Sequence, residues 1–153
     1  MERSRQTGPG DATILTLVSE IATIDQLLHA RLQKSLPKGM AVSHFTVLNH
    51  LAVSASEKTP AQLARSFNLT KGALTNTLAK LEAAGSVHIR PDWDDGRRKF
   101  VSISPAGRRT LAHASSAVEP VFNEILKTID PEELRAALPL LRKLRQSLAS
   151  PVG

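Results

Sequence analysis

A cluster of basic side chains lies where two short alternating segments of the sequence are joined by a turn. Four positive charges are concentrated there, on Arg90, Arg97, Arg98 and Lys99. Like charges at this density repel one another unless an anion lies near them. The turn itself carries three acidic residues: Asp92, Asp94 and Asp95. We expect one of these carboxylates to hold an arginine side chain in place. The cluster indicates either a site for a polyanion or a surface network of ion pairs without a partner.

A second candidate for anion recognition is one face of a helix predicted over residues 71–84. A stripe that is expected to be buried recurs at i, i+3, i+4 and i+7, on Leu74, Thr77, Leu78 and Leu81. The opposite face carries no acidic residue and presents Lys71, Gly72, Thr75, Asn76 and Lys80. Such a face can enter a DNA major groove, which is about 12 Å wide, without repelling phosphates. The alternative is an ordinary solvated helix face.

Each polar residue of this face is suited to a different contact with DNA. The amide of Asn76 can pair with an adenine edge, and Thr75 can touch a base edge or a thymine methyl group. Lys71 and Lys80 are better suited to phosphates.

Helical periodicity predicts a long amphipathic helix near the N-terminus, over residues 12–36. Its apolar residues recur every three or four positions, and a proline and a glycine follow its end. Asp11 or Thr13 is the expected cap of this helix. Residues 1–11 are polar and include a Gly-Pro-Gly segment, which predicts a flexible tail. Ser43 is the expected cap of a second, shorter helix.

Two helices with clear sequence signals at their ends come next. Thr59, Pro60 and Gln62 form a capping box with proline at the first helical position, which predicts a short helix. After a break, Thr70 is the expected cap of the helix described above. Gly85 follows the end of that helix, where a left-handed residue is favoured.

Alternating hydrophobicity then replaces helical periodicity. The alternation at residues 87–90 and 101–103 predicts a β-hairpin with a long turn. Pro105 opens a further helix, in which Pro120 is expected to introduce a kink. The segment from Asp130 to Glu133 is a capping box for a last helix.

This order of elements predicts a mainly α fold with a small β-hairpin wing. A winged helix-turn-helix is expected over residues 40–104, flanked by helices at residues 12–36 and 105–149. The flanking helices are longer and more apolar than one winged helix can cover, so we expect them to be dimerisation helices. The alternative is a monomer whose terminal helices fold back on each other.

Composition narrows the classes of function. The 153 residues include 20 Lys and Arg against 14 Asp and Glu, a net charge of +6. A basic balance fits a polyanionic partner, either nucleic acid or an anionic membrane. No apolar run approaches the roughly 20 residues that span a bilayer, and the N-terminus lacks the apolar core of a secretory signal. We therefore expect a cytoplasmic protein with no membrane partner.

Sequence signatures of enzymes and of metal sites are missing. There is no Gly-rich phosphate loop and no Gly-x-Ser-x-Gly motif, so we expect no catalytic activity. The chain has no cysteine, which excludes disulfides and thiolate ligands. His44 and His50 are six residues apart, which on a helix turns them about 120° away from each other. We expect neither a metal site nor a cofactor.

The segment from Asp95 to Gly107 resembles the wing of the MarR (multiple antibiotic resistance regulator) family. That wing has the pattern Asp-x-Arg, three residues, an aliphatic, x, Leu-Thr, x-x, Gly, and here Ile103 and Ser104 replace Leu and Thr. Residues 69–85 are similar to the family's recognition helix, which ends in Leu-Glu-x-x-Gly. The order of elements also matches the family over residues 12–149.

The resemblance implies a role for two residues of the wing. Arg97 would be the arginine that enters the DNA minor groove, and Asp95 its positioning partner. Asn76 and Ala84 stand where many relatives carry Arg, and Ser86 stands where relatives often carry a bulky apolar residue. The target DNA sequence therefore does not follow from that of relatives.

The function implied by the resemblance is that of a transcriptional regulator, a repressor that binds a pseudo-palindromic operator on double-stranded DNA as a homodimer. It also implies a small aromatic or anionic effector, held in a crevice lined by His29, Phe45, Leu48 and Asn49. Phe45 and Leu48 are alternatively plain core residues, and His29 a partly exposed helix residue. A winged helix used for protein–protein contact is the alternative function. The operator, the effector and the sign of regulation stay open.

Overall fold

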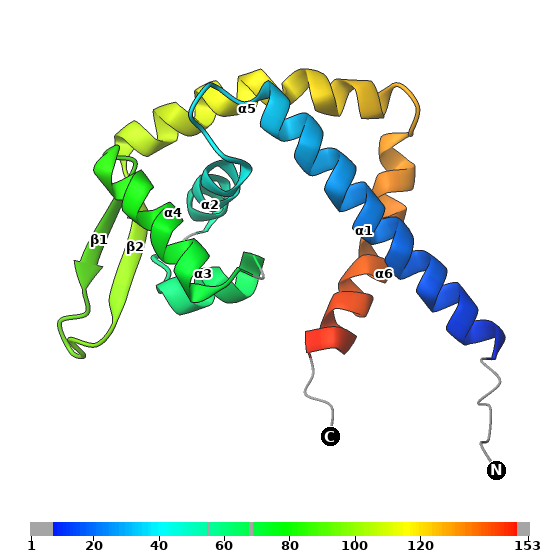
Figure 1. The fold of residues 1–153 in the computed structure, drawn as a ribbon, viewed down its shortest axis with the longest axis horizontal. Helices are drawn as coiled ribbons and strands as arrows, with labels where there is room; N and C mark the ends of the chain where they lie inside the picture. Colours follow the sequence, from blue (N-terminus) through cyan, green and yellow to red (C-terminus); the bar gives the residue numbers. More distant parts are fainter. Residues whose placement is uncertain (1–7, 55, 68, 150–153) are drawn as a thin grey trace, which may run out of the picture. The chain divides into compact units, whose positions relative to one another are not determined.

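The computed structural model describes residues 8–54, 56–67 and 69–149. Its elements, drawn in Figure 1, are α1 (Pro9–Ser35), α2 (Val42–Val53), α3 (Pro60–Phe67), α4 (Lys71–Ala83), β1 (Val87–Pro91), β2 (Lys99–Ile103), α5 (Pro105–Leu126) and α6 (Pro131–Ala149). The expected mainly α fold with a β-hairpin wing is confirmed. The chain divides into two units, the first ending at Ala117 and the second beginning at Val118.

Side-chain caps set the beginnings of three helices, as the sequence predicts. Before α3, the backbone N–H of Thr59 donates to Gln62 Oε1 at 2.9 Å, and the N–H of Gln62 donates to Thr59 Oγ1 at 3.2 Å. Thr70 Oγ1 accepts from the N–H of Ala73 at 3.1 Å and so caps α4. At α6, the N–H of Asp130 donates to Glu133 Oε2 at 3.0 Å. Each such cap stabilises its helix by about 1 kcal/mol.

Two other helix beginnings differ from the prediction. Helix α1 starts at Pro9, so the last residues of the expected tail are helical and neither Asp11 nor Thr13 is the cap. Proline is pre-organised for the first helical position, and the N–H of Gly8 donates to Asp11 Oδ2 at 3.2 Å. The first seven residues of that tail lie outside the described residues.

Helix α2 starts at Val42, so Ser43 lies inside the helix and does not cap it. The backbone N–H of Ala41 instead donates to His44 Nδ1 at 3.2 Å. This imidazole takes the place of the Glu or Gln of an ordinary capping box.

The core of the first unit lies between α2, α3, α4 and the hairpin. Its buried members are Val47, Leu48, Leu51, Leu63, Leu74, Leu78, Leu81, Val87 and Val101. The predicted stripe of α4 is buried, including Thr77, and each fully buried Leu contributes about 1.5–3 kcal/mol. This packing turns the opposite face of α4 toward solvent.

The hairpin is tied to the segment that precedes α3. Strands β1 and β2 are antiparallel, with Val87 opposite Ile103 and Pro91 opposite Lys99. On the other edge of β2, Lys58 exchanges two backbone hydrogen bonds with Val101, at 3.1 and 2.7 Å. The wing and the start of α3 are therefore held at a fixed distance from each other.

The base of the wing is closed by a compact junction of small residues. Gly85 has φ of +72°, as expected for the residue that ends a helix in the left-handed region. Ser104 Oγ donates to the carbonyl of Gly85 at 2.5 Å and accepts from the N–H of Gly107 at 2.9 Å. A Cβ atom at Gly107 would lie 2.0 Å from the carbonyl oxygen of Ser86. This close approach explains the glycine at the end of the wing motif.

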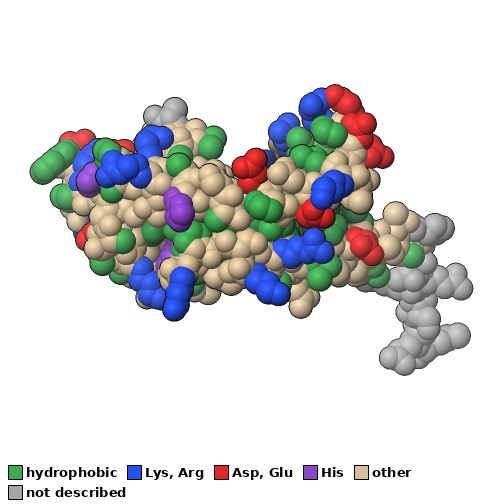
Figure 2. Space-filling view, turned by 90° about the horizontal axis from the view of Figure 1, so that it is seen from above, with side chains coloured by type: hydrophobic (Ala, Val, Ile, Leu, Met, Phe, Trp, Pro, Cys, Tyr) green, Lys and Arg blue, Asp and Glu red, His purple; other side chains and the backbone are tan. Residues whose placement is uncertain are grey.

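Apolar side chains remain exposed on the terminal helices. Helix α6 buries no side chain, and its leucines at i, i+4 and i+7 are 40–43% exposed: Leu134, Leu138 and Leu141. On α1, Ile14, Val18 and Ile24 are likewise exposed. Figure 2 shows hydrophobic side chains reaching the visible surface among the charged ones. Among the helices described, none has both the length and the apolar character needed to cross a membrane.

Candidate nucleic-acid interface

The exposed face of α4 carries every residue that the sequence predicts for it. Lys71, Gly72, Thr75, Asn76 and Lys80 are all exposed, while the opposite stripe is buried. The hydroxyl of Thr75 donates to the carbonyl of Lys71 at 2.7 Å, which leaves its oxygen as an acceptor. No acidic side chain lies in the first turn of the helix. The prediction that this face carries no acidic residue is wrong in the last turn, because Glu82 is exposed seven residues after Thr75 and so on the same side of the helix. This face has the shape and charge of a helix that reads a DNA groove.

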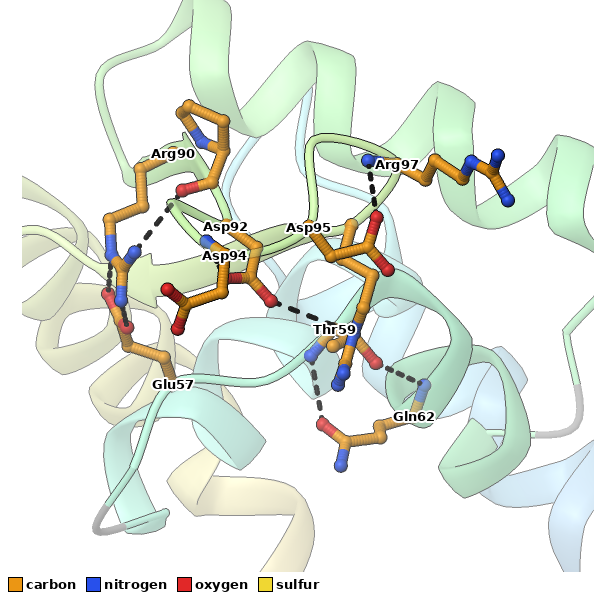
Figure 3. A network of polar contacts seen from close by, with 10 residues as sticks. Glu57, Thr59, Gln62, Arg90, Asp92, Asp94, Asp95 and Arg97 are labelled. Carbon is orange, nitrogen blue, oxygen red and sulfur yellow. Dashed lines mark hydrogen bonds and ion pairs between the residues drawn. The ribbon is translucent and has the colours of Figure 1, made fainter.

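The tip of the wing is ordered by its acidic residues (Figure 3). Asp95 Oδ1 accepts from the backbone N–H of Arg97 at 3.1 Å, and the carbonyl of Asp95 accepts from the N–H of Arg98 at 3.0 Å. Asp92 Oδ2 lies 4.0 Å from Nε of Arg98. Asp95 thus fixes the backbone that carries Arg97, while Asp92 holds an arginine side chain. The Arg97 side chain points away from these contacts.

Arg90, unlike the other cations of the wing, pairs with a carboxylate outside the wing. Its Nε and Nη2 donate to the two carboxylate oxygens of Glu57 at 3.0 and 2.5 Å, and its guanidinium lies 4.8 Å from the centroid of the Phe100 ring. The hydrogen bond to Glu57 raises the pKa of Arg90, and the charges of Glu57 and Asp92 act in the same direction. Arg90 therefore braces the wing with its charge largely balanced. Glu57 was missed because it lies 33 residues away in the sequence.

A cleft of about 490 Å³ joins the two predicted regions. Lys71 and Thr75 of α4 line it together with Arg97, Arg98 and Lys99 of the wing. Its third wall comes from α3 and the residue before it, with Thr59, Gln62 and Arg65. Sequence reasoning missed this wall, although Gln62 and Arg65 are three residues apart on the exposed side of a helix whose Leu63 is buried.

The four residues predicted for an effector site differ in their burial. Leu48 is fully buried in the core, which is the alternative that its apolar character left open. Phe45 is half-buried, whereas His29 and Asn49 are exposed on α1 and α2. Three cavities formed by the described residues are lined by other side chains, so the predicted effector site stays a prediction.

The fold and the exposed cationic surface define a winged helix-turn-helix protein. A family model described as the MarR family matches residues 38–98, which span the helix-turn-helix and most of the wing. The crystal structure of the transcriptional regulator BldR from Sulfolobus solfataricus is 28% identical, with a TM-score of 0.76 over 90% of this chain and 99% of BldR. Over the helix-turn-helix and most of the wing the chain is therefore similar to MarR-family transcriptional regulators.

Two further relatives come from Escherichia coli. A variant of MarR complexed with operator DNA is 25% identical, with a TM-score of 0.71 over 86% of this chain and 95% of that one. The transcriptional regulator HosA is 35% identical over 75 residues, which are 49% of this chain and 56% of HosA. The chain therefore spans little more than half the length of this curated relative.

Proposed function

We propose that this chain is a transcriptional repressor that binds a pseudo-palindromic DNA duplex as a homodimer. The observation that carries the proposal is one cleft that is lined both by exposed residues of the first turns of α4, where no acidic residue lies, and by three exposed cations of the wing. A basic surface of this kind is the electrostatic footprint of a nucleic-acid-binding protein. The operator DNA held by the similar MarR structure supports the same partner.

Within this proposal the two regions have different tasks. Helix α4 lies in the major groove, where Asn76 and Thr75 contact base edges and Lys71 and Lys80 contact phosphates. The wing places Arg97 in the adjacent minor groove, where a narrow groove concentrates negative potential. The backbone bond from Asp95 holds Arg97 at the tip, as the positioning role implied by the resemblance requires.

The apolar side chains that the terminal helices leave exposed support the proposal of a homodimer. The exposed leucines of α6 and the exposed aliphatic residues of α1 provide surfaces that a second copy can bury. A two-fold dimer would set two recognition helices about 34 Å apart, one turn of DNA. Repression, the small aromatic or anionic effector and the cytoplasmic location remain predictions.

Electrophoretic mobility of DNA tests the proposal. The pure protein is mixed with the intergenic duplex beside its own gene, with a random duplex of equal length as the control. We expect retardation of the intergenic duplex at lower protein concentration, with an affinity that falls steeply as salt is added. A protein that retards neither duplex in dilute buffer would favour the alternative function, contact with another protein.

A further inference from the structure

One glutamate next to the wing has no role in the proposed function. Glu57 lies between α2 and α3, and its two carboxylate oxygens accept from Nε and Nη2 of Arg90 at 3.0 and 2.5 Å. The third nitrogen of the guanidinium, Nη1, donates to the carbonyl of Pro91 at 3.2 Å. Every nitrogen of this guanidinium therefore has an acceptor within the chain, and two of the three share one carboxylate.

Arg90 lies on the outer face of the hairpin, beside a second arginine. It is opposite Phe100 in the register of the two strands, so both side chains are on one face of the hairpin. Their neighbours Ile89 and Val101 pack into the core on the other face. The guanidiniums of Arg90 and Arg98 lie 4.8 and 5.9 Å from the centroid of the same Phe100 ring. Arg90 is thus close to a cation that lines the cleft of the proposed interface.

The two arginines differ in how far their charges are balanced. Arg98 is exposed, and the carboxylate of Asp92 lies 4.0 Å from its Nε. Arg90 instead forms two charge-assisted hydrogen bonds with one carboxylate, which is the strong arrangement for an arginine. A DNA phosphate would gain Arg90 only by displacing Glu57, which would leave that carboxylate unpaired beside another anion. The pair of Glu57 and Arg90 therefore presents almost no net charge to DNA.

We propose that Glu57 limits the strength of DNA binding by neutralising Arg90. This inference rests on the proposed function and assigns a role to a residue that does not itself contact DNA. Sequence-independent binding to DNA grows with the number of phosphates that the protein neutralises. With Arg90 paired, three cations of the wing act on the phosphates instead of four. The pair thereby lowers the salt concentration at which the protein is released from random DNA.

The test compares four variants by the slope of log affinity against log salt concentration. Glu57→Gln removes the negative charge and keeps an acceptor for Arg90, and Arg90→Gln removes the positive charge. The double variant, Glu57→Gln with Arg90→Gln, restores the balance of charge. Glu20→Gln is the matched control, because it removes one exposed negative charge from α1, outside the winged helix-turn-helix. Fluorescence anisotropy of a labelled random duplex and of a labelled intergenic duplex gives both affinities, and a thermal melt of each variant confirms folding.

For Glu57→Gln we expect tighter binding to both duplexes in dilute buffer. The slope should become steeper by about 0.9 per subunit, or about 1.8 for a dimer that uses both copies. Arg90→Gln should weaken binding, because the charge of Glu57 is then unbalanced. The double variant should return the slope to that of the wild-type protein, and Glu20→Gln should leave it unchanged.

An unaltered slope for Glu57→Gln, or unaltered binding by Arg90→Gln, would overturn this inference alone, provided that the wild-type protein binds both duplexes. Weaker binding by both single variants without recovery in the double variant would also contradict it. The pair would then act by holding the wing in place and not by its charge. Failure of the wild-type protein to bind either duplex would overturn the proposed function as well.

Discussion

The base and the tip of the wing are built from opposite kinds of interaction. At the base, Ser86 and Ser104 are buried, and the hydroxyl of Ser104 joins the end of α4 to the start of α5. At the tip, Arg97 is exposed, and the carboxylate of Asp95 orders its backbone without pairing with its charge.

The difference separates residues that stabilise the fold from residues that are expected to bind DNA. A buried hydrogen bond or a close backbone contact contributes to stability whether or not DNA is present. An exposed cation contributes little to stability. Its charge contributes to binding when an anion lies beside it. Substitutions at the base should therefore change the free energy of unfolding, and substitutions at the tip should change DNA affinity.

The largest effect is expected at Gly107. Alanine there would place Cβ 2.0 Å from the carbonyl oxygen of Ser86 and 2.9 Å from a side-chain carbon of Ile103. We expect Gly107→Ala to lower the free energy of unfolding by about 3 kcal/mol, because backbone must move to relieve the contact. Denaturant unfolding at fixed protein concentration measures this. Gly72→Ala is the control, since a Cβ there meets nothing within 4 Å. Equal losses for the two variants would show that the base is not closely packed.

A smaller loss of stability is expected at Ser104. Ser104→Ala removes the acceptor of the Gly107 N–H and the donor to the Gly85 carbonyl. The expected cost is about 1–3 kcal/mol, the range for buried polar groups left without a partner. Ser102→Ala on the same strand is the comparison, because Ser102 is only half-buried. The role assigned to Ser104 fails if the two variants unfold at the same denaturant concentration.

At the tip, Arg97→Ala should weaken DNA binding and leave stability and dimerisation intact. We expect affinity to fall about tenfold, which corresponds to about 1.4 kcal/mol. The free energy of unfolding should change by less than about 0.5 kcal/mol, as for other surface substitutions. Anisotropy with the intergenic duplex and sedimentation of the free protein give the two readouts. Unchanged affinity at moderate salt would remove Arg97 from the interface.

The smallest effect concerns pH and lies outside the wing, at His44. Burial lowers the pKa of His44 below its ordinary value of about 6.5, and the charge of Lys80 lowers it further. The folded state therefore binds fewer protons than the unfolded state just below pH 6.5, so stability is complete above that pH and declines as pH falls through it. Protonation would also remove the Nδ1 lone pair that caps α2.

His44→Gln should flatten this decline, because Gln can accept the same hydrogen bond without titrating. The free energy of unfolding of the wild-type and His44→Gln proteins is measured between pH 7.5 and 5.5 as conditions of the experiment. Subtracting one curve from the other removes the contribution of the other histidines. Parallel curves would show that His44 does not contribute to acid sensitivity.

Local signals made much of the fold predictable from the sequence. The Thr59 capping box, the Thr70 cap, the left-handed Gly85 and the stripe of α4 each depend on residues within one or two helical turns. The same holds for the exposed face of α4, which follows once the buried stripe is known. The start of α1 departs from the prediction for a local reason too, since proline is common in loose tails and is also favoured at the first position of a helix.

Long-range pairings were not predictable in this way. The bond between Arg90 and Glu57, the pairing of Lys58 with Val101 and the position of Arg65 in the cleft depend on how separate elements pack. Leu48 illustrates the same limit, because an apolar residue on a helix can line a pocket or fill a core, and only packing decides.

Hydroxyl-radical footprinting on the intergenic duplex tests the central claim most directly. The two winged helix-turn-helix units of a two-fold dimer should protect two symmetry-related patches of DNA backbone about 10 base pairs apart. Each patch should include the strand between a major groove and the adjacent minor groove. A single protected patch, or uniform cleavage at saturating protein, would contradict the account.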